Sequence, residues 1–183
     1  MCSNEQKGHA KNKIACPLFF SKPAIFSQNN NLVLFCTHHM LDLNTQAPAI
    51  KAFDQNNIEH TLKEYKGRWV LLYFYPKDDT PGCTREACGL RDNYEKFQAK
   101  AVVIGVSADS VETHKKFAEK FHLPFTLLAD PKKEIIRAYG AAGFTTKRVS
   151  YLIDPKGMIF KAYPKVDPST HAEEIFKDLE NLK

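Results

Sequence analysis

The sequence lacks any apolar run long enough to cross a membrane as a helix. No stretch approaches the roughly 18 to 20 consecutive apolar residues that such a helix needs. A strong excess of one charge is lacking as well, since 26 Lys and Arg residues face 21 Asp and Glu residues. The remaining charge of +5 is not gathered into one basic run, and no basic stripe alternates with aromatic residues. We therefore expect neither a membrane-spanning protein nor a nucleic-acid-binding one.

Cysteine is scarce and irregularly spaced. The chain has five, at Cys2, Cys16, Cys36, Cys83 and Cys88, and this odd, irregular set does not suggest the disulfide framework of a secreted scaffold. A zinc site is not supported, because the C-x4-C spacing of the last two is unusual and no nearby Cys or His pair completes four ligands. We expect no metal and no cofactor, a reducing cytoplasm as the compartment, and redox chemistry at Cys83 and Cys88.

Residues 1–39 lack the sustained periodicity of the rest of the chain. Their apolar pieces, residues 18–20 and 32–36, are too short for a convincing signal peptide, and Gln and Asn residues separate them. Several lysines face the single acid Glu5, which leaves a targeting presequence open, but the segment has no arginine. We predict that Met40 is the natural start and that residues 1–39 are an upstream over-extension or else a disordered tail. The intact mass of the natively expressed protein would decide between a start at Met40 and the full chain.

From Met40 onward the pattern is that of one α/β domain, residues 40–183. Strands are expected at 49–53, 58–62, 69–75, 101–107, 125–129, 149–153 and 158–162. Helices are expected to begin near Cys83, with about four turns, and at Ser110, Pro131 and Pro168. Strands that alternate with helices, with a hairpin at each end of the series, predict a central mixed sheet flanked by helices. This is the layout of a thioredoxin-like fold with an N-terminal β-hairpin.

One stretch joins the strand at 69–75 to the helix that follows it. The strand has almost no polar alternation, which is typical of a strand covered on both faces. A polar loop follows, and Cys83 then stands in the first turn of a helix, where unpaired N–H groups and the helix dipole favour a thiolate. Thr80 supplies a hydroxyl nearby, and Pro76 is expected to shape the pocket floor. Open α/β sheets place their sites at this end of a central strand.

A thiolate that reduces a peroxide must be ionised and in line with the O–O bond, and the leaving oxygen must be stabilised. Arg148, at the head of the strand at 149–153, is the candidate for the positive side chain, because a guanidinium would bridge the thiolate and the peroxide oxygens. Thr80 would accept a hydrogen bond from the peroxide and donate one to the sulfur. The product would be a sulfenic acid on Cys83, which a second thiol converts to a disulfide.

Cys88 lies five residues after Cys83. In an intact helix the two Cα atoms would be roughly 8 Å apart, beyond the usual disulfide range of about 4.4–6.8 Å. A Cys83–Cys88 disulfide therefore requires the first turns of the helix to unwind, and we predict that oxidation melts this segment.

The other polar residues of interest are expected to be structural. Glu86 and Arg91 are interpreted as an ion pair on one helix, although Arg91 could still line the site. Asp78 and Asp79 are expected in a solvated loop. The histidines are expected on the surface rather than as catalytic bases: His60, His114, His122 and His171.

The stretch YPKDDTPGCTREACGLRDNYEKF, followed by VVIGVSADSVETHKKFAEKFHLPFTLLAD, resembles the bacterioferritin comigratory protein, or peroxiredoxin Q, branch of the peroxiredoxins. The resemblance covers residues 40–183. Pro76, Thr80 and Cys83 stand at the family's P-x-x-x-T-x-x-C spacing, and the family's arginine matches Arg148 in KRVSYLID. The resemblance gives no role to the three cysteines of residues 1–39.

This resemblance implies a thioredoxin fold and thiol-dependent reduction of hydrogen peroxide and organic hydroperoxides. It implies that Cys83 is the peroxidatic cysteine and Cys88 the resolving one, with thioredoxin as the usual reductant and a monomer as the expected state. We therefore expect an antioxidant peroxidase. Two alternatives stay open. One is a thiol–disulfide oxidoreductase, although those enzymes use C-x-x-C and residue 86 is glutamate. The other is a redox sensor or holdase that signals by unwinding the Cys83–Cys88 helix.

Overall fold

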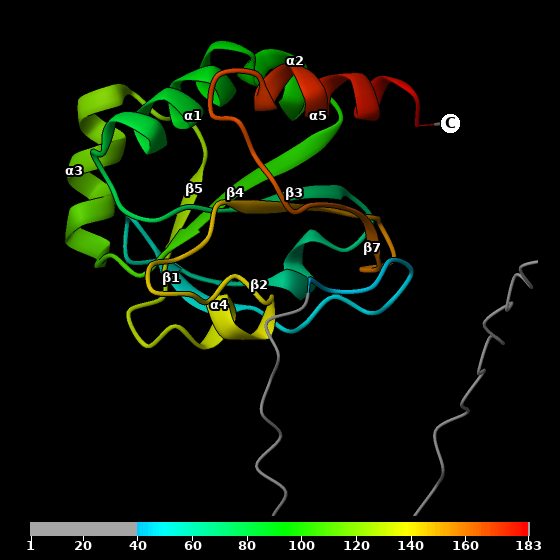
Figure 1. The fold of residues 1–183 in the computed structure, drawn as a ribbon, viewed down its shortest axis with the longest axis horizontal. Helices are drawn as coiled ribbons and strands as arrows, with labels where there is room; N and C mark the ends of the chain where they lie inside the picture. The colour runs from blue at the N-terminus through cyan, green and yellow to red at the C-terminus, as the bar shows by residue number, and fades with distance from the viewer. Residues whose placement is uncertain (1–39, 183) are drawn as a thin grey trace, which may run out of the picture. The chain divides into compact units, whose positions relative to one another are not determined.

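The computed structural model describes residues 40–182, which contain a seven-stranded mixed sheet flanked by helices (Figure 1). The strands are β1 (Lys51–Asp54), β2 (Glu59–Thr61), β3 (Trp69–Phe74), β4 (Ala101–Ser107), β5 (Thr126–Ala129), β6 (Val149–Ile153) and β7 (Ile159–Tyr163). The helices are the 3-10 helix η1 (Leu62–Tyr65), α1 (Pro81–Asp92), α2 (Tyr94–Gln98), α3 (Val111–Phe121), α4 (Glu134–Ala138) and α5 (His171–Glu180). The predicted fold class is confirmed. The prediction for residues 1–39, with their three cysteines, lies outside the described residues.

The order of the strands is β2-β1-β5-β4-β3-β6-β7. Strands β3, β4 and β5 are parallel, while β6 pairs antiparallel with β3, and β1 pairs antiparallel with β5. The predicted hairpins are β1–β2 and β6–β7. In the second, the Asp154 carboxylate accepts hydrogen bonds from the amides of Lys156 and Met158, and Gly157 supplies the left-handed residue of the turn. This topology puts β3 inside the sheet, between β4 and β6.

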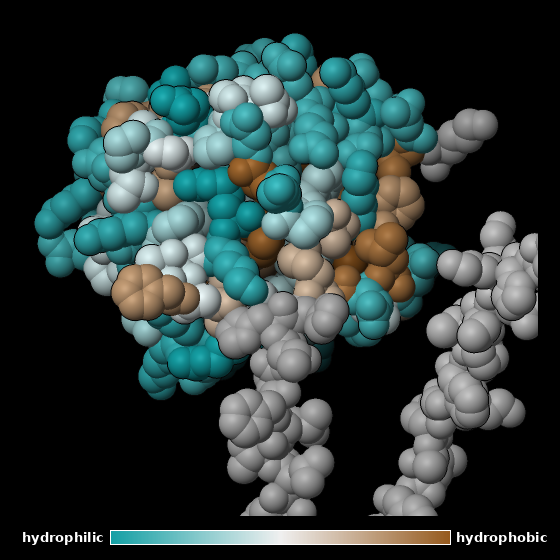
Figure 2. Space-filling view, in the orientation of Figure 1, coloured by the Kyte–Doolittle hydropathy of each residue, from teal (hydrophilic) through white to brown (hydrophobic). Residues whose placement is uncertain are grey.

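Strand β3 is covered on both faces, as its unbroken apolar sequence predicts. Leu71 and Tyr73 face the helix layer of α1, α2, α3 and α5, whereas Leu72 and Phe74 face the layer that contains α4. All four side chains are buried. Figure 2 shows mainly hydrophilic residues on the outside of the α1, α2 and α5 layer, as expected for helices whose apolar side packs on a sheet. The end of β3 is therefore a firm base for the loop that follows.

The sequence predicts one helix of about four turns that begins near Cys83, but the structure has two shorter helices, α1 and α2, in its place. Helix α1 begins at Pro81, because a proline has no N–H to lose at the first helical position. The helix ends at Asp92 and is capped by Asn93, whose side-chain amide donates to the carbonyl of Gly89, and α2 starts directly after this residue. Asn93 has left the helical conformation, with φ −108° and ψ 12°, so it separates the two helices.

Helix α4 begins at Glu134 rather than at Pro131. The buried carboxylate of Asp130 accepts hydrogen bonds from the amides of Glu134 and Ile136, which satisfies two N–H groups of the first turn. Lys133 adopts a left-handed conformation just before the helix. No helix within residues 40–182 is long and apolar enough to cross a membrane.

Candidate active site

Cys83 lies in the first turn of α1, just beyond the end of β3, and its side chain is only 1% exposed. The first intrahelical bond of α1 runs from the amide of Thr84 to the carbonyl of Thr80, so the amides before Thr84 have no helical partner. The thiol therefore sits where free N–H groups and the helix dipole favour a negative charge. The placement is the one that the sequence predicts.

Arg148 contacts this thiol, with Nη2 3.3 Å from the sulfur of Cys83. The sheet explains the contact between residues so far apart in sequence. Strand β6 runs antiparallel to β3 with Val149 opposite Phe74, so Arg148 lies beside the end of β3. Gly82 completes the fit, because a Cβ on Gly82 would lie 3.2 Å from Nη2 of Arg148. A side chain at position 82 would press on the guanidinium that holds the sulfur.

The second arm of the guanidinium donates to Glu86, which lies one turn after Cys83 on the same helix. Glu86 is 1% exposed, and its other carboxylate oxygen has no hydrogen-bond partner among the described residues. Burial raises the pKa of Glu86 to about 7, although the charge of Arg148 opposes this shift. The predicted Glu86–Arg91 pair is wrong: Arg91 instead binds Asp92 and the carbonyl of Phe121.

The raised pKa of Glu86 predicts a pH-dependent stability. Between its ordinary value of 4.5 and about 7 the folded protein binds the proton more tightly than the unfolded chain, so stability falls as pH rises. Because each tenfold change in proton affinity is worth about 1.4 kcal/mol, wild type should lose up to about 3 kcal/mol relative to Glu86→Gln between these pH values. Urea denaturation over a pH series measures this. The control is Glu112→Gln, a change at an exposed carboxylate of α3, whose free energy of unfolding should depend on pH as that of wild type does. If the pH dependence of Glu86→Gln also paralleled wild type, the raised pKa of Glu86 would be contradicted.

Thr80 and Pro76 flank the loop that leads from β3 to Cys83. Thr80 is the N-cap residue of α1, in an extended conformation with φ −91° and ψ 149°. Its hydroxyl donates to the carbonyl of Lys77 at 3.1 Å rather than to the sulfur of Cys83, which differs from the prediction. The hydroxyl oxygen keeps its lone pairs for a donor such as a peroxide O–H. Pro76 is half-buried and directly follows the buried Tyr75.

Cys88 lies in the third turn of the same helix and is half-buried, and both Cys83 and Cys88 are free thiols. Residues five apart on a helix point in directions about 140° apart, so the two thiols do not face each other while α1 is intact. The structure therefore represents the fully helical, dithiol form. No cluster of three or more His, Cys, Asp or Glu side chains suited to a metal occurs within residues 40–182.

A model of the AhpC/TSA family matches residues 43–162. The chain belongs to this family, in its peroxiredoxin Q/Bcp branch. It is 42% identical over 142 residues to the chloroplastic peroxiredoxin Q of Sedum lineare, a match that covers 74% of this chain and 76% of the relative. It is 38% identical over 152 residues to peroxiredoxin Bcp of Bacillus subtilis (strain 168), with 78% and 97% covered.

Among solved structures, the chain is similar to the bacterioferritin comigratory protein of Xanthomonas campestris, in a trapped intermediate/ligand complex described for its alkyl peroxide reduction activity. The TM-score is 0.67 at 30% identity, with 72% of this chain and 90% of that chain covered. The thioredoxin-like fold and the family resemblance drawn from the sequence are thus confirmed. The protein is a peroxidase of the oxidoreductase class.

Three polar residues of this peroxiredoxin are buried, although the sequence predicts that they are exposed. Asp78, His114 and His171 are buried, so the predictions of a solvated loop and surface histidines are wrong for them. His114 lies three residues after Val111 and three before Phe117, and it therefore shares the inward face of α3. That spacing was visible in the sequence. His171 donates to or accepts from the hydroxyl of Ser150, and burial lowers its pKa.

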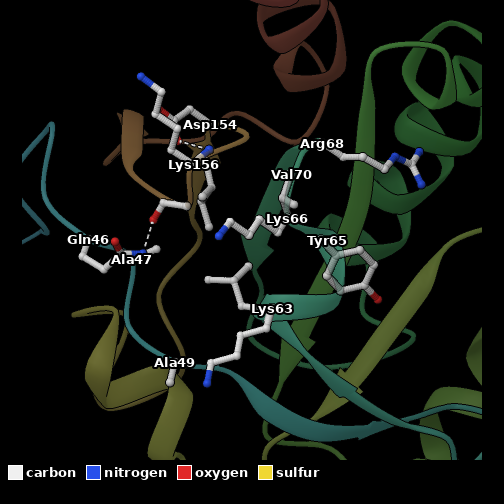
Figure 3. A pocket seen from close by; sticks show the side chains of 13 residues that line it. Gln46, Ala47, Ala49, Lys63, Tyr65, Lys66, Arg68, Val70, Asp154 and Lys156 are labelled. Carbon is white, nitrogen blue, oxygen red and sulfur yellow. Dashed lines mark hydrogen bonds between the residues drawn. The ribbon is translucent and has the colours of Figure 1, made fainter.

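A cavity of about 480 Å³ lies at the other end of β3 (Figure 3). Its walls include Val70, at the start of β3, and Lys66, from the loop before it. Cys83, Arg148 and Glu86 do not line this cavity, and its basic side chains come from exposed positions. The peroxide site of this peroxiredoxin is therefore to be sought around Cys83 and not in this cavity.

Proposed function

We propose that this peroxiredoxin reduces hydrogen peroxide and organic hydroperoxides through Cys83. The observation that carries the proposal is the 3.3 Å contact between the Cys83 sulfur and the Arg148 guanidinium at the N-terminus of α1. A helix N-terminus and a cation at one sulfur favour the thiolate, and both also face the place where charge develops on the leaving oxygen. The alkyl peroxide reduction described for the Xanthomonas relative supports the inclusion of organic substrates.

The reaction follows from these positions. The Cys83 thiolate attacks one peroxide oxygen, an S–O bond forms, and the O–O bond breaks. The sulfur loses two electrons to the peroxide, whose second oxygen takes a proton and leaves as water or an alcohol. Arg148 holds the sulfur and the attacked oxygen together, and the hydroxyl oxygen of Thr80 accepts a hydrogen bond from the peroxide O–H. Cys83 is left as the sulfenic acid.

Cys88 then completes the cycle. Its thiol attacks the sulfenic sulfur, the Cys83–Cys88 disulfide forms, and water leaves. Because the two thiols diverge on intact α1, this step requires the first turns to unwind. Thioredoxin supplies the two electrons that restore both thiols. We place the protein in the cytoplasm, where free thiols persist, and propose that it acts as a monomer.

Cys88→Ser separates the two halves of the cycle. With thioredoxin, its reductase and NADPH, wild type should consume peroxide continuously, while Cys88→Ser should lose most of this turnover. Its Cys83 should still be oxidised once, because Arg148 and the helix N-terminus are untouched. NADPH consumption reports turnover, and mass spectrometry after trapping reports the sulfenic acid.

Two outcomes would contradict this scheme. Full thioredoxin-linked turnover by Cys88→Ser would show that Cys88 is not the resolving thiol. A wild-type protein that is oxidised once and never turned over by thioredoxin would favour the sensor alternative over the enzyme cycle. The small-thiol donor dithiothreitol is the control, since it should reduce the sulfenic acid of Cys88→Ser directly.

A further inference from the structure

The loop between β3 and α1 contains a buried acid that the reaction above does not use. Asp78 is 6% exposed, two residues before the N-cap Thr80. Its two carboxylate oxygens and its amide are all bonded. Oδ1 accepts from the Tyr75 hydroxyl at 2.7 Å, Oδ2 lies 2.7 Å from Nδ1 of His114, and the amide donates to Asp109 at 2.9 Å. Asp78 thus ties the loop to Tyr75, just after β3, to His114 on α3, and to Asp109 in the segment before α3.

His114 is the partner that determines the chemistry of this cluster. Its side chain is fully buried, and its second nitrogen, Nε2, lies 3.1 Å from the carbonyl oxygen of Leu128 on β5. A carbonyl only accepts, so Nε2 carries a proton. Nδ1 faces a carboxylate oxygen, so a proton lies between these two atoms as well. The Tyr75 hydroxyl donates to the other oxygen of the same carboxylate, so Asp78 is the acceptor in both contacts and His114 is the donor. With donors at both ring nitrogens, this geometry is that of an imidazolium beside a carboxylate.

The position of the loop between β3 and α1 depends on this pair, because the other contacts of the loop with α3 are weak. A cavity of about 190 Å³, lined by residues 77–79 and by α3 side chains including Phe117, lies between the loop and α3, so close packing alone does not hold the loop there. Asp79 adopts a left-handed backbone conformation, φ +54°, which a non-glycine residue keeps only where its neighbours hold it. A second tie, Lys120 to Asp79, is half-exposed on both sides and therefore weak.

We propose that the Asp78–His114 ion pair is a positioning device that holds Thr80 and the first turn of α1 in the peroxide-reactive form. The inference rests on the proposed function, because it assigns the pair a role in the balance between that form and the unwound form that closes the Cys83–Cys88 disulfide. Two further titratable groups lie against the pair: the Tyr75 hydroxyl, just after β3, contacts both members, and the Asp109 carboxylate, before α3, accepts from the Asp78 amide. Loss of the pair shifts the balance toward the unwound form.

This predicts opposite effects on two rates. Asp78→Asn keeps the shape of the side chain and removes its charge. The second-order rate constant for oxidation of Cys83 by hydrogen peroxide should fall about tenfold, and the first-order rate of disulfide closure should rise about tenfold, the size expected for one charge-assisted hydrogen bond. Rapid quenching, alkylation of thiols and mass spectrometry give both rates. A merely structural role would slow both steps together, and that result, or no change in either rate, would overturn the proposal.

The matched control is Lys120→Met, which removes the exposed tie between the same loop and the same helix. Both rates should stay within about twofold of wild type, and effects equal to those of Asp78→Asn would overturn the role of the buried pair. Where Asp78→Asn does not fold, Tyr75→Phe is the second variant, because it removes one hydrogen bond to Asp78. It must also slow the oxidation of Cys83 and speed the closure of the disulfide.

Two measurements test the charge state of the pair and its positioning role without measuring catalysis. Nitrogen-15 NMR of wild-type His114 should show protons on both ring nitrogens at neutral pH, and a ring with one proton would overturn the ion pair. Hydrogen exchange should be faster at Thr84, the first hydrogen-bonded amide of α1, and at the amides that directly follow it in Asp78→Asn than in Lys120→Met, and equal exchange would overturn the positioning role. A wild-type protein that consumes no peroxide would refute the proposed function while leaving both of these results to decide the state of the pair.

Discussion

Replacing Cys83 with serine is expected to lower peroxide consumption by at least about 10³-fold. Serine is nearly isosteric with cysteine, so the buried site keeps its packing. The serine hydroxyl, however, does not ionise near neutral pH and is a poor nucleophile toward peroxide. The environment of Cys83 distinguishes it from Cys88, the second free thiol within residues 40–182. Cys83 has the helix N-terminus and the Arg148 guanidinium, whereas Cys88 lies in the third turn of α1, where the N–H groups are already bonded.

Direct measurement of peroxide loss, with dithiothreitol as reductant, checks this prediction without depending on thioredoxin. Cys88→Ser is the matched control, because it makes the same chemical change on the same helix and should keep activity in this assay. A Cys83→Ser protein with activity near that of wild type would refute the central assignment. Loss of activity in both variants would instead show that dithiothreitol does not reach the Cys83 sulfenic acid.

The fold could be predicted from sequence because its signals are local. The unbroken apolar run of β3, the turn at Asp154 and the cysteine at the start of a helix are each contained in a few residues. The helix break at Asn93 was missed because apolar residues continue across it at helical spacing, while a single side-chain bond to Gly89 ends α1. Periodicity describes which face is buried, and it does not show where a backbone hydrogen bond is replaced.

The partners in the candidate site could be predicted only in part. Arg148 was found because the reaction requires a cation and the start of a strand could provide one. Glu86 was assigned to Arg91, but residues five apart do not face each other on a helix, and the actual partner, Arg148, comes from β6. The Asp78–His114 pair joins a loop to another helix, so no short spacing reveals it. Its one visible signal was the place of His114 on the apolar face of α3.

Arg148→Met is expected to lower the second-order rate constant for peroxide reduction by about 10²-fold or more, the usual effect of removing one preorganised charge from a reacting centre. The same change leaves Glu86 buried without its cation and should destabilise the fold by about 1–3 kcal/mol. Arg148→Lys should recover little activity, because one ammonium does not reproduce the fork that binds Glu86 and the Cys83 sulfur together.

The double variant Arg148→Met/Glu86→Gln separates catalysis from stability. Removal of the buried acid should restore most of the stability that Arg148→Met loses, because no buried carboxyl group is left without its partner. It should not restore the rate, because the sulfur of Cys83 and the leaving oxygen still lack the guanidinium. Urea denaturation and stopped-flow oxidation of the same preparations measure the two quantities side by side. Recovery of the rate together with stability would mean that Arg148 acts on Cys83 only by holding Glu86 and the first turns of α1 in place.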